Sequence, residues 1–267
     1  MSGYAREQSD FSLLFVAGKA VVIFMRNKGK TVKILSAVLA VIIGTAVCVC
    51  IYLYENGLFK PAHNNVKFKD GQIKVACVGD SVTYGMKMKN WNENAYPFVL
   101  RSLLGENYCV ENFGFSGRTV MLSGDRPYMN EKLYQKSLEF EPDIVILQIG
   151  SNDSKPYNWK DSETFKADYQ TLLDSFKNLS SDPEIFICTP PPAFSVNGVV
   201  AYDIQAETIS GEITSAIKEI AEKENIEVID LQELFDGKSE LFVDGLHPNI
   251  EGGKLLANAV YEAIHED

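Results

Sequence analysis

Residues 71–267 alternate between short apolar runs and longer segments in which apolar residues recur at a helical spacing. The apolar runs have the length of buried strands and predict strands at 73–78, 108–112, 144–149, 184–188 and 226–231. The segments between or after them predict helices near 95–104, 131–140, 163–179, 207–224 and 252–264. Strands that alternate with helices are typical of a parallel sheet with helices on both faces, and no internal repeat is visible. We therefore predict one α/β domain at 71–267.

A different pattern precedes this domain. The 21 residues of 34–54 carry no charge, which matches the roughly 20 residues that a helix needs to cross about 30 Å of hydrocarbon. Basic residues gather at 26–33 and Glu55 follows the segment, so the positive-inside rule places the N-terminus in the cytoplasm and the domain outside the cell. We expect a cytoplasmic segment at 1–33, a transmembrane signal-anchor helix at 34–54 and a linker at 55–70, with the protein in the cell membrane as a single-pass protein.

A cleaved secretory signal peptide is the alternative to this anchor, and it would make the protein secreted. Such peptides have an apolar core of about 7 to 15 residues that ends at a small-x-small cleavage site. Here the apolar segment is longer and ends in the bulky residues 51–54, which favours a retained anchor. Met25 followed by Arg26 would make a natural start for such an anchor, so we hypothesise that residues 1–24 are a misassigned start.

Composition narrows the class of function. The formal net charge is −11, and the acidic residues are concentrated in the predicted domain. An acidic domain repels phosphate backbones, which argues against nucleic-acid binding. The five cysteines show no CxxC or Cys/His spacing, so they support neither a disulfide framework nor a zinc site. We expect Cys77, Cys109 and Cys188 to be buried thiols, and we expect no metal and no organic cofactor.

Polar and glycine residues follow the predicted strands at 79–81, 112–114 and 150–153, and Thr189 and prolines follow the fourth strand. Ligands of parallel α/β sheets bind outside the carboxyl ends of the strands, so the site is expected there. Ser81 follows the first strand in "VACVGDSVTYG" and suits either a nucleophile or a helix cap. The segment is not a GxSxG elbow, because Thr83 stands where that motif has its last glycine.

A serine nucleophile needs a general base, which is most often a histidine. The chain has three histidines, of which His63 lies in the predicted linker and His265 lies near the C-terminus. His247 follows Asp244 by three residues and precedes a proline in "VDGLHPN". A turn of this spacing lets the Asp244 carboxylate reach Nδ1, which leaves Nε2 free to accept a proton. A purely structural turn is the alternative for this short motif.

Acyl transfer through a serine also needs hydrogen-bond donors for the developing oxyanion. Each of the first three strand ends offers one donor. These donors are the Ser81 backbone N–H, the Gly114 backbone N–H and the Asn152 side-chain amide. Gly114 could instead serve a turn, and Asn152 could instead cap one.

The blocks "GDSVTYG", "NFGFSG", "GSND" and "DGLHP" occur in this order and together resemble the SGNH or GDSL hydrolase family. The resemblance implies a flavodoxin-like three-layer α/β/α sandwich with a central parallel sheet. It also implies Ser81 as nucleophile, His247 as base, Asp244 as orienting acid, and Ser81, Gly114 and Asn152 as the oxyanion hole. We interpret Asp80 and the aspartate of "GSND", Asp153, as residues that brace loops.

The segment 112–159 looks like bacterial members of this family that are assigned as carbohydrate O-acetylesterases. This implies pocket-lining roles for Arg118, Tyr128, Lys155 and Trp159, with Asp125, Tyr157 and Asn158 as further candidates. The loop from Pro190 to about Gln205 is expected to form part of the pocket wall. For these aromatic residues, core or loop packing is an equal alternative.

These features predict a membrane-tethered extracellular serine esterase that removes small acyl groups, with acetyl as the expected group, from a carbohydrate. The enzymatic alternatives are a lysophospholipase or thioesterase, and an acyltransferase that acts on cell-wall glycans. The non-enzymatic alternative is a carbohydrate-binding pseudoenzyme that keeps the fold. The intact set of Ser81, Asn152, Asp244 and His247 argues against the pseudoenzyme.

Overall fold

The computed structural model of the chain describes residues 30–55 and 67–265. The chain divides into two compact units, Met1–Glu55 and Asn56–Asp267, which we describe separately. In the first unit, Lys30–Glu55 forms helix α2. Most of the predicted cytoplasmic segment 1–33 and of the predicted linker 55–70 lies outside the described residues, as does the whole of 1–24 with its hypothesised misassigned start. The predicted domain boundaries therefore stay predictions.

The prediction of a transmembrane helix at 34–54 is corrected. Among the described residues, no helix is both long enough and apolar enough to cross a membrane. The sequence-based prediction rested on the uncharged run at 34–54.

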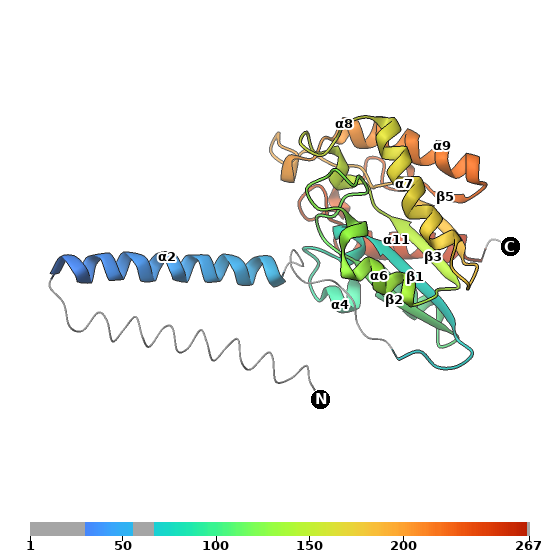
Figure 1. Cartoon of the computed structure of the whole chain (residues 1–267), viewed down its shortest axis with the longest axis horizontal. Helices are drawn as coiled ribbons and strands as arrows, with labels where there is room; N and C mark the ends of the chain where they lie inside the picture. The colour runs from blue at the N-terminus through green and yellow to red at the C-terminus, as the bar shows by residue number, and fades with distance from the viewer. Residues whose placement is uncertain (1–29, 56–66, 266–267) are drawn as a thin grey trace. The chain divides into compact units, whose positions relative to one another are not determined.

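The second unit is built on one sheet of five parallel strands in the order β2-β1-β3-β4-β5 (Figure 1). The strands are β1 (Ile73–Gly79), β2 (Tyr108–Gly114), β3 (Ile144–Gln148), β4 (Glu184–Cys188) and β5 (Glu227–Ile229). This is the flavodoxin-like strand order, so the α/β class and the parallel sheet predicted from the sequence agree with the structure. After β1 the chain builds β2 on one side and β3 on the other, so the order reverses beside β1.

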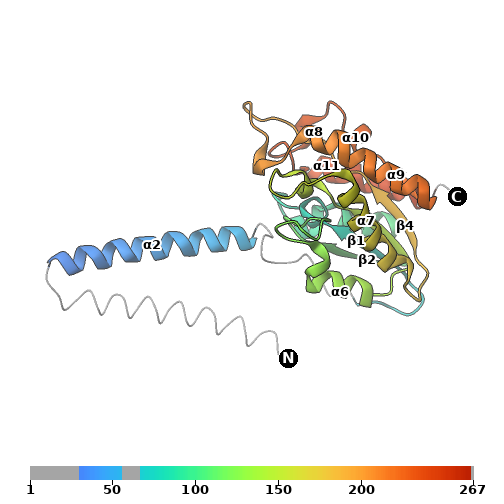
Figure 2. The same ribbon diagram turned by 45° about the horizontal axis from the view of Figure 1, so that its top comes forward.

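Helices cover both faces of the sheet (Figures 1 and 2). The helices α6 (Lys132–Glu139), α7 (Ser162–Lys177) and α9 (Thr214–Glu224) pack on one face, and α5 (Tyr96–Leu104) and α11 (Ile250–Ala263) pack on the other. The shorter elements are α3 (Ser81–Tyr84), α4 (Trp91–Asn94), η1 (Tyr128–Asn130), η2 (Ser151–Ser154), η3 (Ala201–Asp203), α8 (Ala206–Thr208), η4 (Ile209–Ile213), α10 (Leu231–Leu234) and η5 (Ser239–Leu241).

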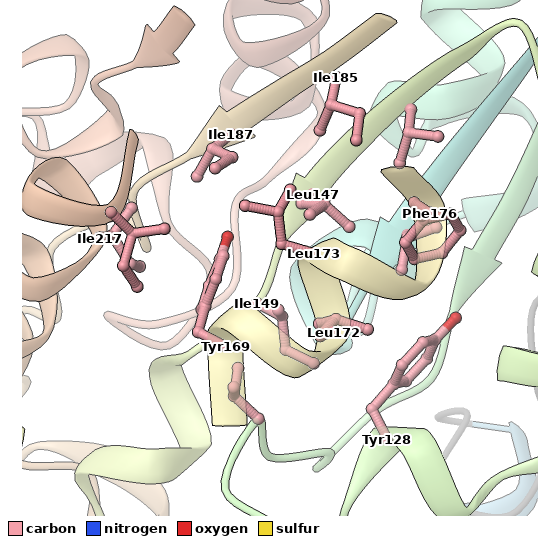
Figure 3. Close-up of a cluster of buried hydrophobic side chains, with 14 of the residues drawn as sticks. Tyr128, Leu147, Ile149, Tyr169, Leu172, Leu173, Phe176, Ile185, Ile187 and Ile217 are labelled. Atoms are coloured by element: carbon pink, nitrogen blue, oxygen red, sulfur yellow. The ribbon is translucent and has the colours of Figure 1, made fainter. Parts of the chain in front are cut away.

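The two hydrophobic cores follow from the alternation of side chains along the strands. In β3, Val145 and Leu147 face the core under α6, α7 and α9, whereas Ile144 and Ile146 face the core under α5 and α11. All four of these side chains are buried, which is why the strand reads as a continuous apolar run. Figure 3 shows the first core, in which Leu147 lies beside Leu173 of α7.

Two elements differ from the sequence-based expectation. The single helix predicted at 207–224 is divided into α8, the π-helical turn η4 and α9. The strand predicted at 226–231 is shorter, because the Asp230 side chain accepts hydrogen bonds from the backbone N–H groups of Gln232 and Glu233 and so begins α10. Cys77, Cys109 and Cys188 are buried and unpaired, as predicted.

Candidate active site

Ser81 lies at the carboxyl end of β1, where the strand order reverses and where ligands of such sheets bind. It is the first residue of α3, and the N-cap of that short helix is Asp80, whose carboxylate accepts a hydrogen bond from Val82 N at 3.0 Å. The helix ends at Gly85 in a left-handed conformation, φ 87°. Because Asp80 supplies the cap, the Ser81 hydroxyl is left for other contacts.

The Ser81 hydroxyl meets the one histidine that sequence reasoning singled out. His247 Nε2 lies 3.0 Å from Ser81 Oγ, and both residues are buried. On the other side of the ring, His247 Nδ1 lies 2.9 Å from Asp244 Oδ2 and 3.1 Å from Asp244 Oδ1. An ionised carboxylate only accepts hydrogen bonds, so this contact assigns the proton to Nδ1 and leaves the Nε2 lone pair directed at Ser81.

The turn that carries this histidine is held by its own backbone. The Asp244 carboxylate accepts hydrogen bonds from His247 N at 2.9 Å and from Leu246 N at 3.2 Å. Gly245 is required between them, because its φ is +81° and a Cβ there would lie 2.2 Å from the carbonyl oxygen of Phe194. Burial alone would raise the pKa of the Asp244 carboxyl, but the hydrogen bonds from His247 and Leu246 hold that pKa well below its usual value. Asp244 is therefore an anion at neutral pH.

Two of the three predicted oxyanion donors are available at this strand edge. The Ser81 N–H belongs to the first turn of α3 and has no hydrogen-bond partner among the described residues. Asn152 lies in η2 after β3, and its Nδ2 donates one hydrogen bond to the carbonyl of Arg118 at 3.1 Å. An amide nitrogen carries two hydrogens, so a second donor remains on Asn152.

The third predicted donor, Gly114, is already engaged within the fold. Its N–H already donates to Asn112 Oδ1 at 2.8 Å. A Cβ on Gly114 would lie 2.3 Å from the backbone nitrogen of Tyr84, so this glycine lets the backbone of α3 pack closely on β2. Gly117, the second glycine of the block "NFGFSG", has φ 81° and an N–H without a partner in the described part of the chain. Sequence reasoning missed Gly117, and the repeated glycine was the available signal.

Asp80 and Asp153 lie in the interior below the site. The Asp153 carboxylate accepts hydrogen bonds from Val120 N at 3.0 Å and Met121 N at 2.8 Å, which braces the loop after β2. Burial raises the pKa of Asp153 to about 7 and that of Asp80 to about 6. The Asp153 contacts agree with the predicted bracing of a loop, whereas Asp80 caps α3.

Two predicted substrate-binding residues have their polar groups engaged within the fold. The Arg118 guanidinium donates to Glu131 Oε1 at 2.7 Å and lies over the ring of Phe115, 3.2 Å from its centroid. Tyr128 is fully buried and donates to the carbonyl of Phe113 at 2.7 Å. Figure 3 shows Tyr128 among the core side chains. Both side chains therefore have partners within the fold.

Four of the other predicted pocket residues, Lys155, Tyr157, Asn158 and Trp159, lie after β3, and Asp125 lies between β2 and β3. Trp159 packs against Phe165 with ring centroids 5.8 Å apart, and Lys155 is largely buried, which lowers the pKa of its ammonium. Asn158 donates to the carbonyl of Asn152 at 2.9 Å and so supports the predicted oxyanion residue. Asn158 Nδ2 also donates to Asp125 Oδ1 at 3.0 Å. Tyr157 is 59% exposed.

Among residues 30–55 and 67–265, no group of three or more His, Cys, Asp or Glu side chains is arranged to hold a metal ion.

A further residue at the site was not singled out from the sequence. Tyr202 Oη donates to Asp244 Oδ2 at 3.1 Å, from the loop that was expected to wall the pocket. The sequence around Tyr202 contains no local pattern that predicts this contact.

Comparison with known proteins finds relatives that match most of the α/β unit. The profile of the GDSL-like lipase/acylhydrolase family matches residues 77–255. An acetylxylan esterase of Xylanibacter ruminicola is 35% identical over 214 residues, which are 73% of this chain and 44% of that protein. A multidomain esterase of Ruminococcus flavefaciens is 25% identical over 233 residues, which are 73% of this chain and 28% of that protein. The chain thus spans less than half the length of these two relatives.

Solved structures share the fold. An aryl esterase of M. smegmatis superposes with a TM-score of 0.60 at 18% identity, over 73% of this chain and 99% of that one. An acetyl xylan esterase superposes with a TM-score of 0.57 at 21% identity, over 72% of this chain and 100% of that one. At these identities the likeness concerns the fold alone.

Proposed function

Since the chain belongs to the GDSL-like lipase/acylhydrolase family, we propose that it is a serine esterase that removes acetyl groups from a carbohydrate. The family resemblance seen in the four sequence blocks is confirmed, and membership of this family supports the prediction of an ester-hydrolysing enzyme. The single observation that carries the proposed mechanism is the chain of contacts from Ser81 Oγ through His247 to Asp244.

In the first half of the reaction, Ser81 Oγ attacks the ester carbonyl carbon while His247 Nε2 takes the hydroxyl proton. The carbonyl oxygen becomes an oxyanion, and we assign its stabilisation to the Ser81 N–H, the Asn152 amide and the Gly117 N–H. His247 then gives its proton to the leaving sugar oxygen as the C–O bond breaks. The products of this half are the free alcohol and an acetyl ester of Ser81.

In the second half, a water molecule replaces the alcohol. His247 removes one proton from this water, and the resulting hydroxide oxygen attacks the acetyl carbon. When the second oxyanion collapses, Ser81 Oγ leaves and takes back the proton from His247. Acetic acid is released, which then ionises to acetate, and the enzyme returns to its starting state. Throughout, the ionised Asp244 keeps the imidazole oriented and balances its transient positive charge.

The acetylated carbohydrate is favoured as substrate by the acetylxylan esterase that is 35% identical to this chain. The same catalytic contacts would also serve a lysophospholipase, a thioesterase or a glycan acyltransferase. These alternatives differ in the length of the acyl chain and in whether water or a sugar accepts the acyl group. We further propose that the enzyme works outside the cell, because a polymeric acetylated carbohydrate would meet it there. Activity on such a polymer with intact cells and with culture medium tests this location.

The activity is tested with a fluorophosphonate probe, which reacts with activated serines. The wild-type protein should be labelled, Ser81→Ala should not, and Ser180→Ala, which changes an exposed serine, should be labelled like the wild type. Loss of Ser81 should lower the hydrolysis of nitrophenyl acetate by about 10⁴-fold or more. Labelling that persists in Ser81→Ala, or that is missing from the folded wild type, would overturn the proposed role of Ser81.

The substrate is tested with a panel of acylated compounds. We expect release of acetate from acetylated xylo-oligosaccharides, and activity on nitrophenyl esters that declines steeply beyond about butyrate. A preference for long acyl chains would favour a lipolytic enzyme instead. Transfer of the acetyl group to an added sugar in place of water would favour the acyltransferase.

A further inference from the structure

Tyr202 contacts both His247, the proposed base, and Asp244, the carboxylate that orients it. Its hydroxyl donates to Asp244 Oδ2 at 3.1 Å, and its ring meets the His247 ring edge to face, with centroids 5.4 Å apart and an interplanar angle of 74°. We infer that Tyr202 is a positioning residue that holds the Asp244 carboxylate and the His247 imidazole in their reactive arrangement. This inference rests on the proposed serine esterase mechanism.

The two oxygens of Asp244 have separate tasks. Oδ1 accepts hydrogen bonds from the backbone N–H groups of Leu246 and His247, which fixes the turn. Oδ2 makes the shorter of the two contacts with the Nδ1 of His247, and it is this oxygen that Tyr202 also holds. A carboxylate can rotate about its last bond, and a second donor on Oδ2 restricts that rotation. The phenol thus acts on the oxygen that orients the histidine.

The segment that carries Tyr202 is tied to both sides of the site. At one end, Phe194 N donates to the carbonyl of Gly245 at 2.7 Å, next to Asp244. At the other end, Gln205 N donates to Ser154 Oγ at 3.2 Å, in the same short helix as Asn152. Ile204 is buried in a small cluster with Leu246. These anchors fix the loop against the turn that holds the base and against the helix that holds the predicted oxyanion donor.

The backbone at Tyr202 is strained. Its φ is 62° and its ψ is 30°, and Asp203 follows with φ 59°. A bulky side chain rarely adopts this left-handed conformation, and such strain persists only where the surroundings hold it. Here the hydrogen bond to Asp244 and the ring contact with His247 provide that support.

The phenol is suited to donate rather than accept. Burial raises the pKa of Tyr202, the Asp244 charge raises it further, and Lys87 acts in the opposite direction. The net pKa lies above its usual value, so the hydroxyl keeps its proton at neutral pH. Because Tyr202 is 43% exposed, replacing it does not remove a core residue.

The test compares Tyr202→Phe with Tyr202→Ala in the full chain. The phenylalanine keeps the ring on His247 but loses the donor, and we expect kcat on nitrophenyl acetate to fall about three- to tenfold with KM nearly unchanged. Tyr202→Ala also loses the ring contact, so its kcat should fall further. Tyr108→Phe, which removes the hydroxyl of a half-buried tyrosine at the amino end of β2, opposite the edge that carries the site, is the matched control and should keep the wild-type kcat.

A double-mutant cycle tests whether Tyr202 acts through Asp244. In an Asp244→Asn background, adding Tyr202→Phe should change kcat by less than about twofold, because the carboxylate that the phenol holds is gone. If the two losses simply multiply, or if Tyr202→Phe keeps the wild-type kcat, the positioning role is wrong.

A readout without substrate separates this inference from the proposed function. The Nδ1 proton of His247 gives an NMR resonance that depends on the Asp244 contact, and the chain has only three histidines to assign. This resonance should move in Tyr202→Phe and stay in place in Tyr108→Phe. A shifted resonance in a protein without esterase activity would support the positioning contact and refute only the esterase. An unmoved resonance would refute the contact itself.

Discussion

His247 Nε2 lies 3.0 Å from Ser81 Oγ, although the two residues are 166 positions apart in the sequence. Ser81 follows the first strand, whereas His247 lies in the turn just before the last helix, α11. The parallel sheet brings them together, because the loops after its strands meet at one edge. That edge also carries Asn152, which follows β3, the neighbour of β1.

Asn152→Ala should lower kcat on nitrophenyl acetate by about 10²- to 10³-fold, since one donor to the oxyanion is lost. KM should change little, because that donor acts mainly on the transition state. Steady-state kinetics with a thermal melt measure both effects. The exposed Asn258→Ala serves as the control, and an equal loss there or a loss below about tenfold for Asn152→Ala would contradict this role.

Gly114→Ala should reduce both stability and activity, because its Cβ would lie 2.3 Å from Tyr84 N in the backbone of α3. The helix that begins at Ser81 must then move. We expect a loss of about 1–3 kcal/mol in the free energy of unfolding and a fall of at least about tenfold in kcat. Gly211→Ala, where no atom lies within 4 Å of the added Cβ, should fold with unchanged or slightly greater stability. A fully active Gly114→Ala would show that α3 is not held by this contact.

Asp80→Asn should change how stability depends on pH. Burial raises the pKa of the Asp80 carboxyl from 3.8 to about 6, so the folded state holds this proton more tightly than the unfolded state. Its contribution to stability is fully present below pH 3.8 and is lost as pH rises through about 6. Between pH 4 and 7, the free energy of unfolding should therefore fall by about 1–3 kcal/mol less in the asparagine variant than in the wild type.

Urea unfolding at several pH values measures this difference. Burial also raises the pKa of Asp153 to about 7. Asp153 therefore adds a pH dependence of stability with the same sign, and Asp80→Asn leaves this carboxyl in place. The control is the exposed Asp236→Asn, which should keep the wild-type slope. Parallel curves for Asp80→Asn and the wild type would contradict the raised pKa.

Leu147→Ala should lower the free energy of unfolding by about 2–5 kcal/mol, because it opens a cavity in the core shown in Figure 3. Leu147 is fully buried in β3 between the sheet and α7. Val199→Ala, at a side chain that is 67% exposed, should stay within about 0.5 kcal/mol of the wild type. Urea unfolding compares the two variants, and similar stabilities would place Leu147 outside the core.

The strands were accessible to sequence reasoning, because strands buried on both faces read as uninterrupted apolar runs. The extent of β5 was not, since a side-chain cap from Asp230 rather than hydropathy decides where it ends. The division of the 207–224 helix by a π turn was equally hidden, because it leaves the spacing of apolar residues almost unchanged.

At the site, the Asp244 contact with His247 follows from a three-residue spacing within one turn, so local sequence indicates it. The roles of Gly114 and Arg118 do not follow from their sequence blocks. The Gly114 N–H donates a hydrogen bond to Asn112, and the Arg118 guanidinium donates one to Glu131. From the sequence, the Gly114 N–H and the Arg118 guanidinium could equally have contacted a substrate. Only the tertiary arrangement of the loop after β2 gives both groups partners within the protein.

The sequence by itself determined the alternation of strands and helices and the residue types of the site, because hydrophobic burial and local turn chemistry act over a few residues. Only the tertiary structure decided that His247 meets Ser81, that Tyr202 holds Asp244, and that Tyr128 is core rather than pocket. Such contacts join segments far apart in the chain. Their distances depend on how loops pack at one edge of the sheet, which no local pattern encodes.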